Sequence, residues 1–230
     1  MDAVILVGCS PRLDESVATL RQRGIPLVAI EGDPADGVPT IGQDNREATR
    51  IAAQHLYDLG HRDIAVVTLS LTRDRARGEL TPDRLAAASS TTALDRLAGA
   101  RDVFPAAGGW VTRGSFVEEG RIAGRALLEQ AGRHPTAIIA QSDLLAAGVI
   151  RAAEELDLNV PGDVSVVGFD GVRVDGLWPY DLTTLVQPAV DKGRAAGRAV
   201  VEMLSGGDPH PSTFTSVFHR GNTTAAPRER

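Results

Sequence analysis

Short apolar runs alternate with longer segments of helical periodicity along most of this 230-residue chain. Runs of four or five apolar residues bounded by glycine, proline or polar residues are typical of buried strands, whereas apolar residues at three- and four-residue steps indicate helices. Their alternation predicts βαβ units around a parallel sheet, and therefore an α/β fold. The predicted strands are Val4–Val7, Leu27–Ile30, 64–67, Ala137–Ala140 and 164–168.

The segments between these strands carry capping residues as well as apolar stripes. Asp44 and Ser142 are each expected to cap the helix that they precede, and Ser115 and Glu118 have the spacing of a capping box. The predicted helices are 13–24, 44–60, one that opens at Thr81-Pro82, 115–132, 142–156 and 188–204. A last extended segment is expected over 214–218, and the polar ending from residue 223 is expected to be disordered.

Composition and charge narrow the class of protein. An apolar content of 43% can bury a sizeable core, in one large domain or in two small lobes. The 24 basic and 30 acidic residues give a formal charge of -6, which disfavours binding of nucleic acid by this chain alone. The single cysteine, Cys9, is expected at a buried strand end, and no Cys/His cluster has zinc spacing. With no membrane-length apolar run and no secretory signal, a cytoplasmic location is expected.

Polar side chains follow three of the predicted strands at their carboxyl ends, where open parallel sheets bind their ligands. They are Ser142, Asp143, Asp170, Arg73, Arg75 and Arg77. Carboxylates accept hydrogen bonds from vicinal hydroxyls, and a guanidinium donates a planar fork. The set favours a polyol or sugar as ligand, while three arginines leave an anionic ligand open.

Each of these residues also has a purely structural interpretation. An aspartate after a strand is a helix cap or a turn former about half the time. An arginine in a polar loop is exposed to solvent in roughly three cases of four. A tryptophan such as Trp110, which follows two glycines, more often packs in a core than stacks on a ligand. No single residue therefore decides the function.

Five longer motifs occur in a fixed order along the chain. They are Leu59-Gly60-His61-Arg62-x-Ile64-Ala65, Pro135-Thr136-Ala137-Ile138-Ile139-Ala140-x-Ser142-Asp143, Leu145-Ala146-Ala147-Gly148-Val149, Val160-Pro161-x-Asp163-Val164-Ser165-Val166-Val167-Gly168-Phe169-Asp170 and Leu182-Thr183-Thr184-Leu185-x-Gln187-Pro188. In this order they resemble the signatures of the LacI/GalR family of bacterial transcriptional regulators. The ending at 218–223 resembles the terminal strand and tail of that family.

The resemblance implies two Rossmann-like lobes joined by three crossovers, a fold shared with periplasmic sugar-binding proteins. The first lobe is expected over residues 1–60 and 188–213, the second over 61–187 and 214–230, with a ligand cleft between them. The strand–helix–strand–helix that opens the first lobe in the family is missing, and so is the helix-turn-helix ahead of it. A truncated first lobe is therefore expected, with DNA bound only through a helix-turn-helix that this chain lacks.

The resemblance also implies ligand contacts before the middle of the chain. Asp44 matches a cleft residue of the first lobe. Arg75 matches an arginine that clamps ligand oxygens, and Trp110 matches an aromatic that stacks on a sugar ring. All three are expected to line the cleft.

Four further contacts are implied in the second half of the chain. Asp143 matches the acidic half of an Asn-Asp pair in which Ser142 replaces the usual asparagine. Asp170 matches an aspartate that binds hydroxyls, and Gln187 matches a residue that lines the cleft at a crossover. Neither a cofactor nor a metal ion is expected.

The function implied is the sensing of a small effector, a sugar or a nucleoside-like molecule, whose binding favours one closure of the lobes over another. A homodimer is expected, with the helix that begins at Ser142 as a candidate contact through Ala146, Ala147 and Gly148. Packing of that face within the chain is the equally weighted alternative.

Two other classes of protein share such a scaffold. A transport-type periplasmic sugar-binding protein would need an export signal or a lipid anchor, and the sequence shows neither. An α/β enzyme would need a nucleophile elbow, a phosphate-binding loop or a dinucleotide motif, and none is found. No enzymatic activity and no membrane partner are therefore expected.

Overall fold

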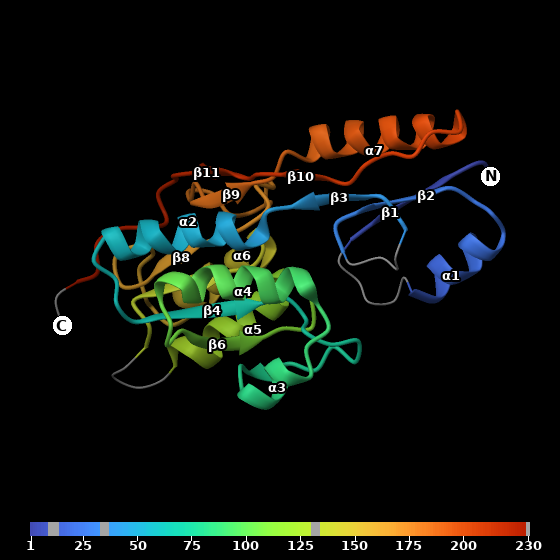
Figure 1. The fold of residues 1–230 in the computed structure, drawn as a ribbon. Helices are drawn as coiled ribbons and strands as arrows, with labels where there is room; N and C mark the ends of the chain where they lie inside the picture. The colour runs from blue at the N-terminus through green and yellow to red at the C-terminus, as the bar shows by residue number, and fades with distance from the viewer. Residues whose placement is uncertain (9–13, 33–36, 130–133, 229–230) are drawn as a thin grey trace.

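The computed structural model describes residues 1–8, 14–32, 37–129 and 134–228. It contains two mainly parallel sheets covered by helices, with the sheets lying end to end (Figure 1). The predictions for Cys9, for Leu13 and for a helix end at Gly132 fall outside the described residues. Among the helices that are described, none has both the length and the apolar character needed to cross a membrane.

The first lobe is built on a four-stranded parallel sheet in the order β1-β2-β3-β10. Its strands are β1 (Val4–Val7), β2 (Leu27–Ile30), β3 (Thr40–Gln43) and β10 (Ser212–Phe214). Helix α1 (Asp14–Gln22) covers one face through Val17, and α7 (Ala189–Leu204) packs three alanines against Val28 and Ile41. These alanines recur at helical spacing, and their small size lets α7 lie close to the sheet.

The second lobe is built on a five-stranded sheet in the order β5-β6-β4-β7-β8, parallel except for β5 at its edge. Its strands are β4 (Ile64–Thr68), β5 (Gly78–Glu79), β6 (Gly108–Val111), β7 (Ala137–Ala140) and β8 (Ser165–Val167). One face is covered by α2 (Asn45–Asp58) and α4 (Thr91–Val103), the other by α5 (Val117–Leu128) and α6 (Asp143–Glu155). Alternate residues of the strands therefore enter two separate cores.

Three segments join the lobes (Figure 1). They lead from β3 to α2, from β9 (Thr184–Val186) to α7, and from β10 to β11 (Val217–His219). Strands β9 and β11 pair with each other in antiparallel fashion at the second lobe. The expected α/β fold with two parallel sheets and three crossovers is thus confirmed.

The packing of α2 differs from the expected division of the chain. The expected boundary placed residues 1–60 in the first lobe, but Ala48, Ala52 and Leu56 lie in the same hydrophobic cluster as β4 and α4. The expected extended segment at 214–218 is also divided, because Phe214 ends β10 in one sheet and Val217 begins β11 in another. We infer a boundary near Asp44 rather than near residue 60.

Two predicted helices differ in part from their sequence signals. The helix predicted to open at Thr81-Pro82 begins there, with Thr81 as its cap, but it stops after α3 (Pro82–Ala86), and Ser90 caps a separate helix, α4. The predicted capping box is absent, because Phe116 precedes α5 without a side-chain cap. The Ser115 hydroxyl instead donates to Ser142 Oγ at 2.7 Å, so it links α5 to α6.

Candidate functional site

The carboxyl ends of the two parallel sheets face each other where the crossovers pass. Figure 1 shows β3 of the first lobe and β4 of the second pointing toward one another. Ligands of open parallel sheets bind at such ends, because the loops there are free to carry polar residues. Seven polar residues from both lobes meet in this region, and we call them the interlobe polar cluster. They are Glu31, Asn45, Arg96, Gln141, Asp170, Gln187 and Lys192.

Arg96 on α4 is the centre of this cluster. Its side chain is only 3% exposed, and its guanidinium lies 3.5 Å from the centre of the Phe169 ring. Arg96 Nε donates to Asn45 Oδ1 at 2.8 Å, and Nη1 donates to the Gln141 carbonyl at 2.5 Å. These neutral acceptors fix the plane of the guanidinium, because its donors have a rigid fork geometry.

Two carboxylates balance the charge of Arg96. Asp170 Oδ1 lies 3.6 Å from Arg96 Nη1, and Glu31 Oε2 lies 3.9 Å from Nη2. Burial raises the pKa of Asp170 above its usual range, while the nearby Arg96 cation opposes that rise. Asp170 has a positive φ of 115°, so its carboxylate leaves β8 through a turn.

Lys192 completes the cluster from α7. Its ammonium group donates to Glu31 Oε1 and to Gln187 Oε1. The amide nitrogen of Gln187 then donates to Asp170 Oδ1 at 2.7 Å. The cluster as a whole offers two cations, two carboxylates and three amides, which can both donate to and accept from a polar ligand.

Of the residues expected to bind a ligand, Asp170 and Gln187 are brought together in the cluster. Asp44 lies beside it, since Asn45 is the next residue, but the Asp44 carboxylate caps α2 by accepting from the Glu47 amide at 3.1 Å. The capping predicted for Asp44 is therefore confirmed.

Arg75 and Trp110 do not reach the cluster. Arg75 is exposed in a turn after β4 and has a φ of 54°. Trp110 packs against the core under α5 and α6, and its buried indole nitrogen has no hydrogen-bond partner. Trp110 thus packs in the core, which was the structural alternative to stacking on a ligand.

Ser142 and Asp143 are buried at the start of α6. Ser142 Oγ accepts from the Leu145 amide, as expected of a cap. Asp143 Oδ1 accepts from Thr184 Oγ1 at 2.5 Å, and Oδ2 accepts from the Val172 amide at 2.7 Å. Burial raises the pKa of Asp143 to about 6. These contacts tie α6 to β9 and to the loop after β8.

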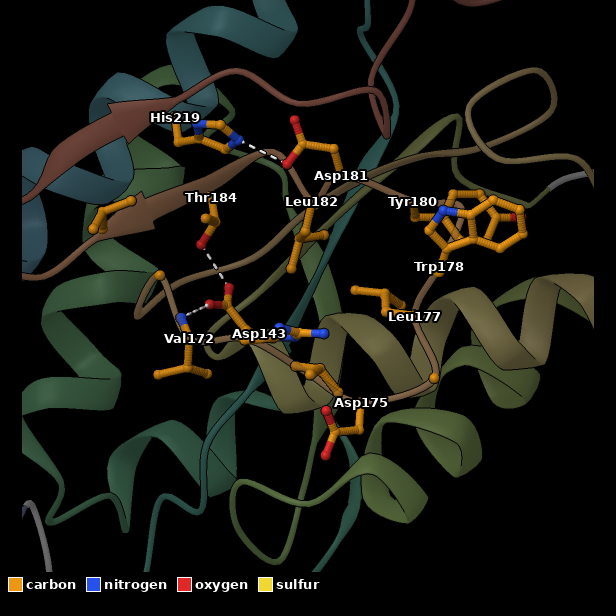
Figure 2. Close-up of a pocket in the computed structure, with 15 residues that line it drawn as sticks. Asp143, Val172, Asp175, Leu177, Trp178, Tyr180, Asp181, Leu182, Thr184 and His219 are labelled. Carbon is orange, nitrogen blue, oxygen red and sulfur yellow. Dashed lines mark hydrogen bonds and ion pairs between the residues drawn. The ribbon is translucent and has the colours of Figure 1, made fainter.

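Asp143 also lines a separate pocket of about 490 Å³ (Figure 2). Figure 2 shows its hydrogen bonds to Thr184 and Val172, with Asp181 and His219 joined nearby. The remaining lining residues come mainly from the loop 171–182. Trp178 in this loop is 89% exposed, beside the exposed charged residues Arg173, Asp175 and Asp181 of the same lining.

Arg96 and Lys192 were missed in the sequence although both leave a signal. Arg96 lies on the buried stripe of α4 with Ala93, Leu97 and Ala100. Lys192 begins the buried stripe of α7 that continues through its alanines. A charged residue on a buried helix face has to find a buried partner, and this marks it as a candidate.

No group of His, Cys, Asp and Glu among the described residues has the arrangement needed to hold a metal ion. The cluster is instead a set of hydrogen-bonding and ionic groups. Its arrangement suits the binding of a small polar molecule rather than metal chemistry.

Comparison with known proteins identifies the family. The family model for the periplasmic binding protein-like domain matches residues 53–223. A LacI family transcriptional regulator from Corynebacterium glutamicum has a solved structure that is 31% identical, with a TM-score of 0.86 over 98% of this chain and 68% of that one. The chain belongs to the LacI family. The resemblance seen in its motifs is therefore confirmed.

The LacI-family relatives with curated names are longer than this chain. The HTH-type transcriptional regulator IpsA of Corynebacterium glutamicum is 33% identical over 98% of this chain and 64% of its own length. The regulator MalR of Streptomyces coelicolor is 35% identical over 92% of this chain and 60% of its own length. The chain thus spans less than two thirds of these relatives.

One further LacI-family structure shows the same fold with a ligand in place. A regulator from Enterococcus faecalis, 21% identical with a TM-score of 0.76 over 99% of this chain and 79% of that one, was solved with bound ribose. At this identity the likeness concerns the fold.

Proposed function

We propose that this chain is the effector-sensing part of a transcriptional regulator, and that it binds a neutral, hydroxyl-bearing molecule at the interlobe polar cluster. The observation that carries the proposal is the ion pair of buried Arg96 with Asp170, whose carboxylate also accepts from Gln187, where the carboxyl ends of both sheets meet. The carboxylate accepts from hydroxyl groups, and the guanidinium and amide donate to oxygens. A sugar or a nucleoside presents both kinds of group.

Charge balance favours a neutral effector over an anionic one. Arg96 and Lys192 already face Glu31 and Asp170, so an added anion would have to displace one of these carboxylates. Phe116, 53% exposed, follows β6 at the carboxyl edge of the sheet. Phe116 takes the stacking role that the family resemblance implied for Trp110, because an exposed ring can cover the apolar face of a sugar.

Regulation follows from closure of the lobes around the effector. An effector that contacts both lobes stabilises the closed arrangement, in which all its contacts are made, over the open one. The shift in this equilibrium is set by the difference in affinity of the effector for the two arrangements. In the complete regulator this change would reach DNA through a helix-turn-helix outside the present sequence. Such a protein acts in the cytoplasm and binds its ligand without turnover.

We infer a homodimer, through a surface other than the one expected from sequence. The small-residue face of α6 packs against α5 of the same chain, because a Cβ added at Gly148 would lie 2.0 Å from the Val117 carbonyl of α5. A second apolar surface is exposed around the loop 171–182. We call it the valine–tryptophan patch, and it consists of Val172, Trp178, Val186 and Val217. Val217 pairs with Val186 across β11 and β9, and Val172, Trp178 and Val186 line one pocket. Exposed apolar side chains gathered around one loop in this way favour a protein interface.

The test is a thermal-shift screen with ribose, hexoses, nucleosides and sugar phosphates. A ligand at about 100 times its Kd adds ~2.7 kcal/mol to the free energy of unfolding, which raises the Tm of a chain of this size by about 5–10 °C. Asp170→Asn should abolish the shift of the best ligand. Arg75→Ala should leave that shift unchanged, because its side chain is exposed and is not a member of the cluster.

Two outcomes would refute the proposal. One is a full shift retained in Asp170→Asn, and the other is a shift lost in Arg75→Ala. Recovery of the ligand unchanged after prolonged incubation separates binding from turnover. A converted ligand would favour the enzyme alternative.

A further inference from the structure

Five side chains of the interlobe polar cluster form a closed ring. Glu31 Oε1 accepts from Lys192 Nζ, which also donates to Gln187 Oε1. Gln187 Nε2 donates to Asp170 Oδ1 at 2.7 Å. Asp170 Oδ1 lies 3.6 Å from Arg96 Nη1, and Arg96 Nη2 lies 3.9 Å from Glu31 Oε2. The path of contacts therefore returns to the residue from which it began.

The members of the ring come from parts of the chain that belong to different lobes. Glu31 follows β2 and Lys192 lies on α7, both in the first lobe. Arg96 and Asp170 belong to the second lobe, and Gln187 lies in the crossover from β9 to α7. Relative motion of the lobes would therefore have to break ring contacts.

Two routes cross between the lobes within the ring. One is the direct contact of Glu31 with Arg96, and the other runs from Lys192 through Gln187 to Asp170. The side chains of Lys192 and Arg96 are 4% and 3% exposed, so the ring carboxylates rather than water balance their charges. Opening the lobes would leave buried charges without their partners, which is costly.

The backbone at Glu31 supports the same interpretation. Its φ is 58°, in the left-handed region that a non-glycine residue adopts only where surrounding contacts hold it. The Glu31 amide donates to the Ile41 carbonyl at 3.0 Å, which anchors this turn to β3. The carboxylate is thereby fixed at the end of the first sheet, facing Arg96.

We propose that this ring is a latch that holds the two lobes together in the ligand-free chain, with Lys192 as its positioning residue. By donating to Gln187 Oε1, Lys192 turns the amide so that its nitrogen faces Asp170. A ligand enters at Arg96, where the two contacts are longest, and its hydroxyl groups bind between the guanidinium and the carboxylates of Glu31 and Asp170, which continue to balance the charge of Arg96. The latch acts without ligand, so it does not depend on which effector the site binds.

The test compares two substitutions on the same helix in the ligand-free chain. Lys192→Met removes one of the two ring cations, and Arg194→Met removes an exposed cation whose partner, Asp191, lies on the same helix. Hydrogen exchange is read at the amide of Asp44, which donates to the Phe214 carbonyl in the last bond of the β3–β10 ladder, where two crossovers leave the first sheet. Motion of the lobes bends the chain at this point, and Asp44 is not itself a member of the ring, so faster exchange there reports movement at the crossovers. Lys192→Met should speed this exchange by about five-fold or more, and Arg194→Met should not change it.

Glu31→Gln provides a second variant that keeps the size of the side chain. It should also speed exchange at Asp44, and it decides the matter if Lys192→Met does not fold. Amides of β4 and β7, within the second lobe, should keep their rates in every variant. Unchanged exchange at Asp44 in the variants that fold would overturn the proposal. So would an equal increase at Asp44, β4 and β7, which indicates a general loss of stability.

Discussion

Asp143 is a fully buried carboxyl whose ionisation is coupled to folding. Burial raises its pKa to about 6, whereas an aspartate in an unfolded chain has a pKa of about 3.9. Between these two values the folded state holds more protons than the unfolded state, so the free energy of unfolding falls as pH rises. The stability that this group contributes is complete below pH ~4 and is lost by pH ~6, and its size is about 3 kcal/mol at most.

The first prediction is that Asp143→Asn removes this part of the pH dependence. An asparagine does not titrate and still accepts a hydrogen bond from Val172 or Thr184. Urea unfolding of the wild type and the variant at several values from pH 4 to pH 7 measures the difference. Asp175→Asn, in the same pocket lining but exposed, serves as the control and should follow the wild type. Equal slopes for Asp143→Asn and the wild type would contradict the assignment.

Two residues of the site were expected from the sequence, for different reasons. Asp170 lies three residues after a buried strand, where ligands of open sheets bind, whereas Gln187 was expected only from the resemblance to the LacI/GalR family. Arg96 and Lys192 lie within helices, and their place in the cluster depends on how α4 and α7 pack. The local pattern shows that such a residue is unusual, and the tertiary fold alone supplies its partner.

At the scale of helices and strands, α5 and α6 can pack closely because glycines lie where the two helices touch. A Cβ at Gly148 would meet the backbone of α5, including the Val117 carbonyl at 2.0 Å. At Gly197 on α7 a Cβ would meet nothing within 4 Å. The same substitution is therefore expected to have opposite effects at these two helical positions.

The second prediction concerns this pair of glycines. Gly148→Ala should lower the free energy of unfolding by about 1–3 kcal/mol or more, because the two helices have to separate. Gly197→Ala should raise it by up to about 1 kcal/mol through the better helix propensity of alanine. Urea denaturation of both variants measures the change. A stable Gly148→Ala would show that α5 and α6 can move apart at little cost.

Helices and strands with a strong apolar pattern were predicted from the sequence. Strands with few apolar residues, which form only by pairing with distant strands, were missed. The strands β1, β2, β4 and β7 and the helix α7 were found close to their observed bounds. β3 and β5 were missed because Thr40–Gln43 and Gly78–Glu79 contain few apolar residues. The polar ending was expected to be disordered, yet Thr223 Oγ1 donates to the Val166 carbonyl at 2.7 Å beside β8.

At the scale of the whole molecule, the sequence pattern indicated an α/β fold but not how two sheets face each other. That expectation came from the family motifs, because a crossover pairs segments that lie far apart in the chain. Gln43 Nε2, for example, donates to Ser216 Oγ at 2.9 Å across 173 residues of sequence. Local periodicity carries no information about such a contact.

The last prediction concerns association of two copies through the valine–tryptophan patch. Trp178 is 89% exposed, and Val172 and Val217 are more than half exposed beside the pocket and its flanking strand. Large aromatic side chains dominate the energetics of interfaces, and truncation of a central one costs ~2 kcal/mol or more. Trp178→Ala should therefore raise the Kd of the dimer by at least about 30-fold.

Sedimentation velocity over a range of concentrations measures this change. Phe116→Ala is the matched control, because Phe116 is also an exposed aromatic but lies outside the patch. Its dimer should dissociate at the same concentration as that of the wild type. If Phe116→Ala weakens the dimer and Trp178→Ala does not, the interface lies near the carboxyl edge of the second sheet, where association would compete directly with access of the effector.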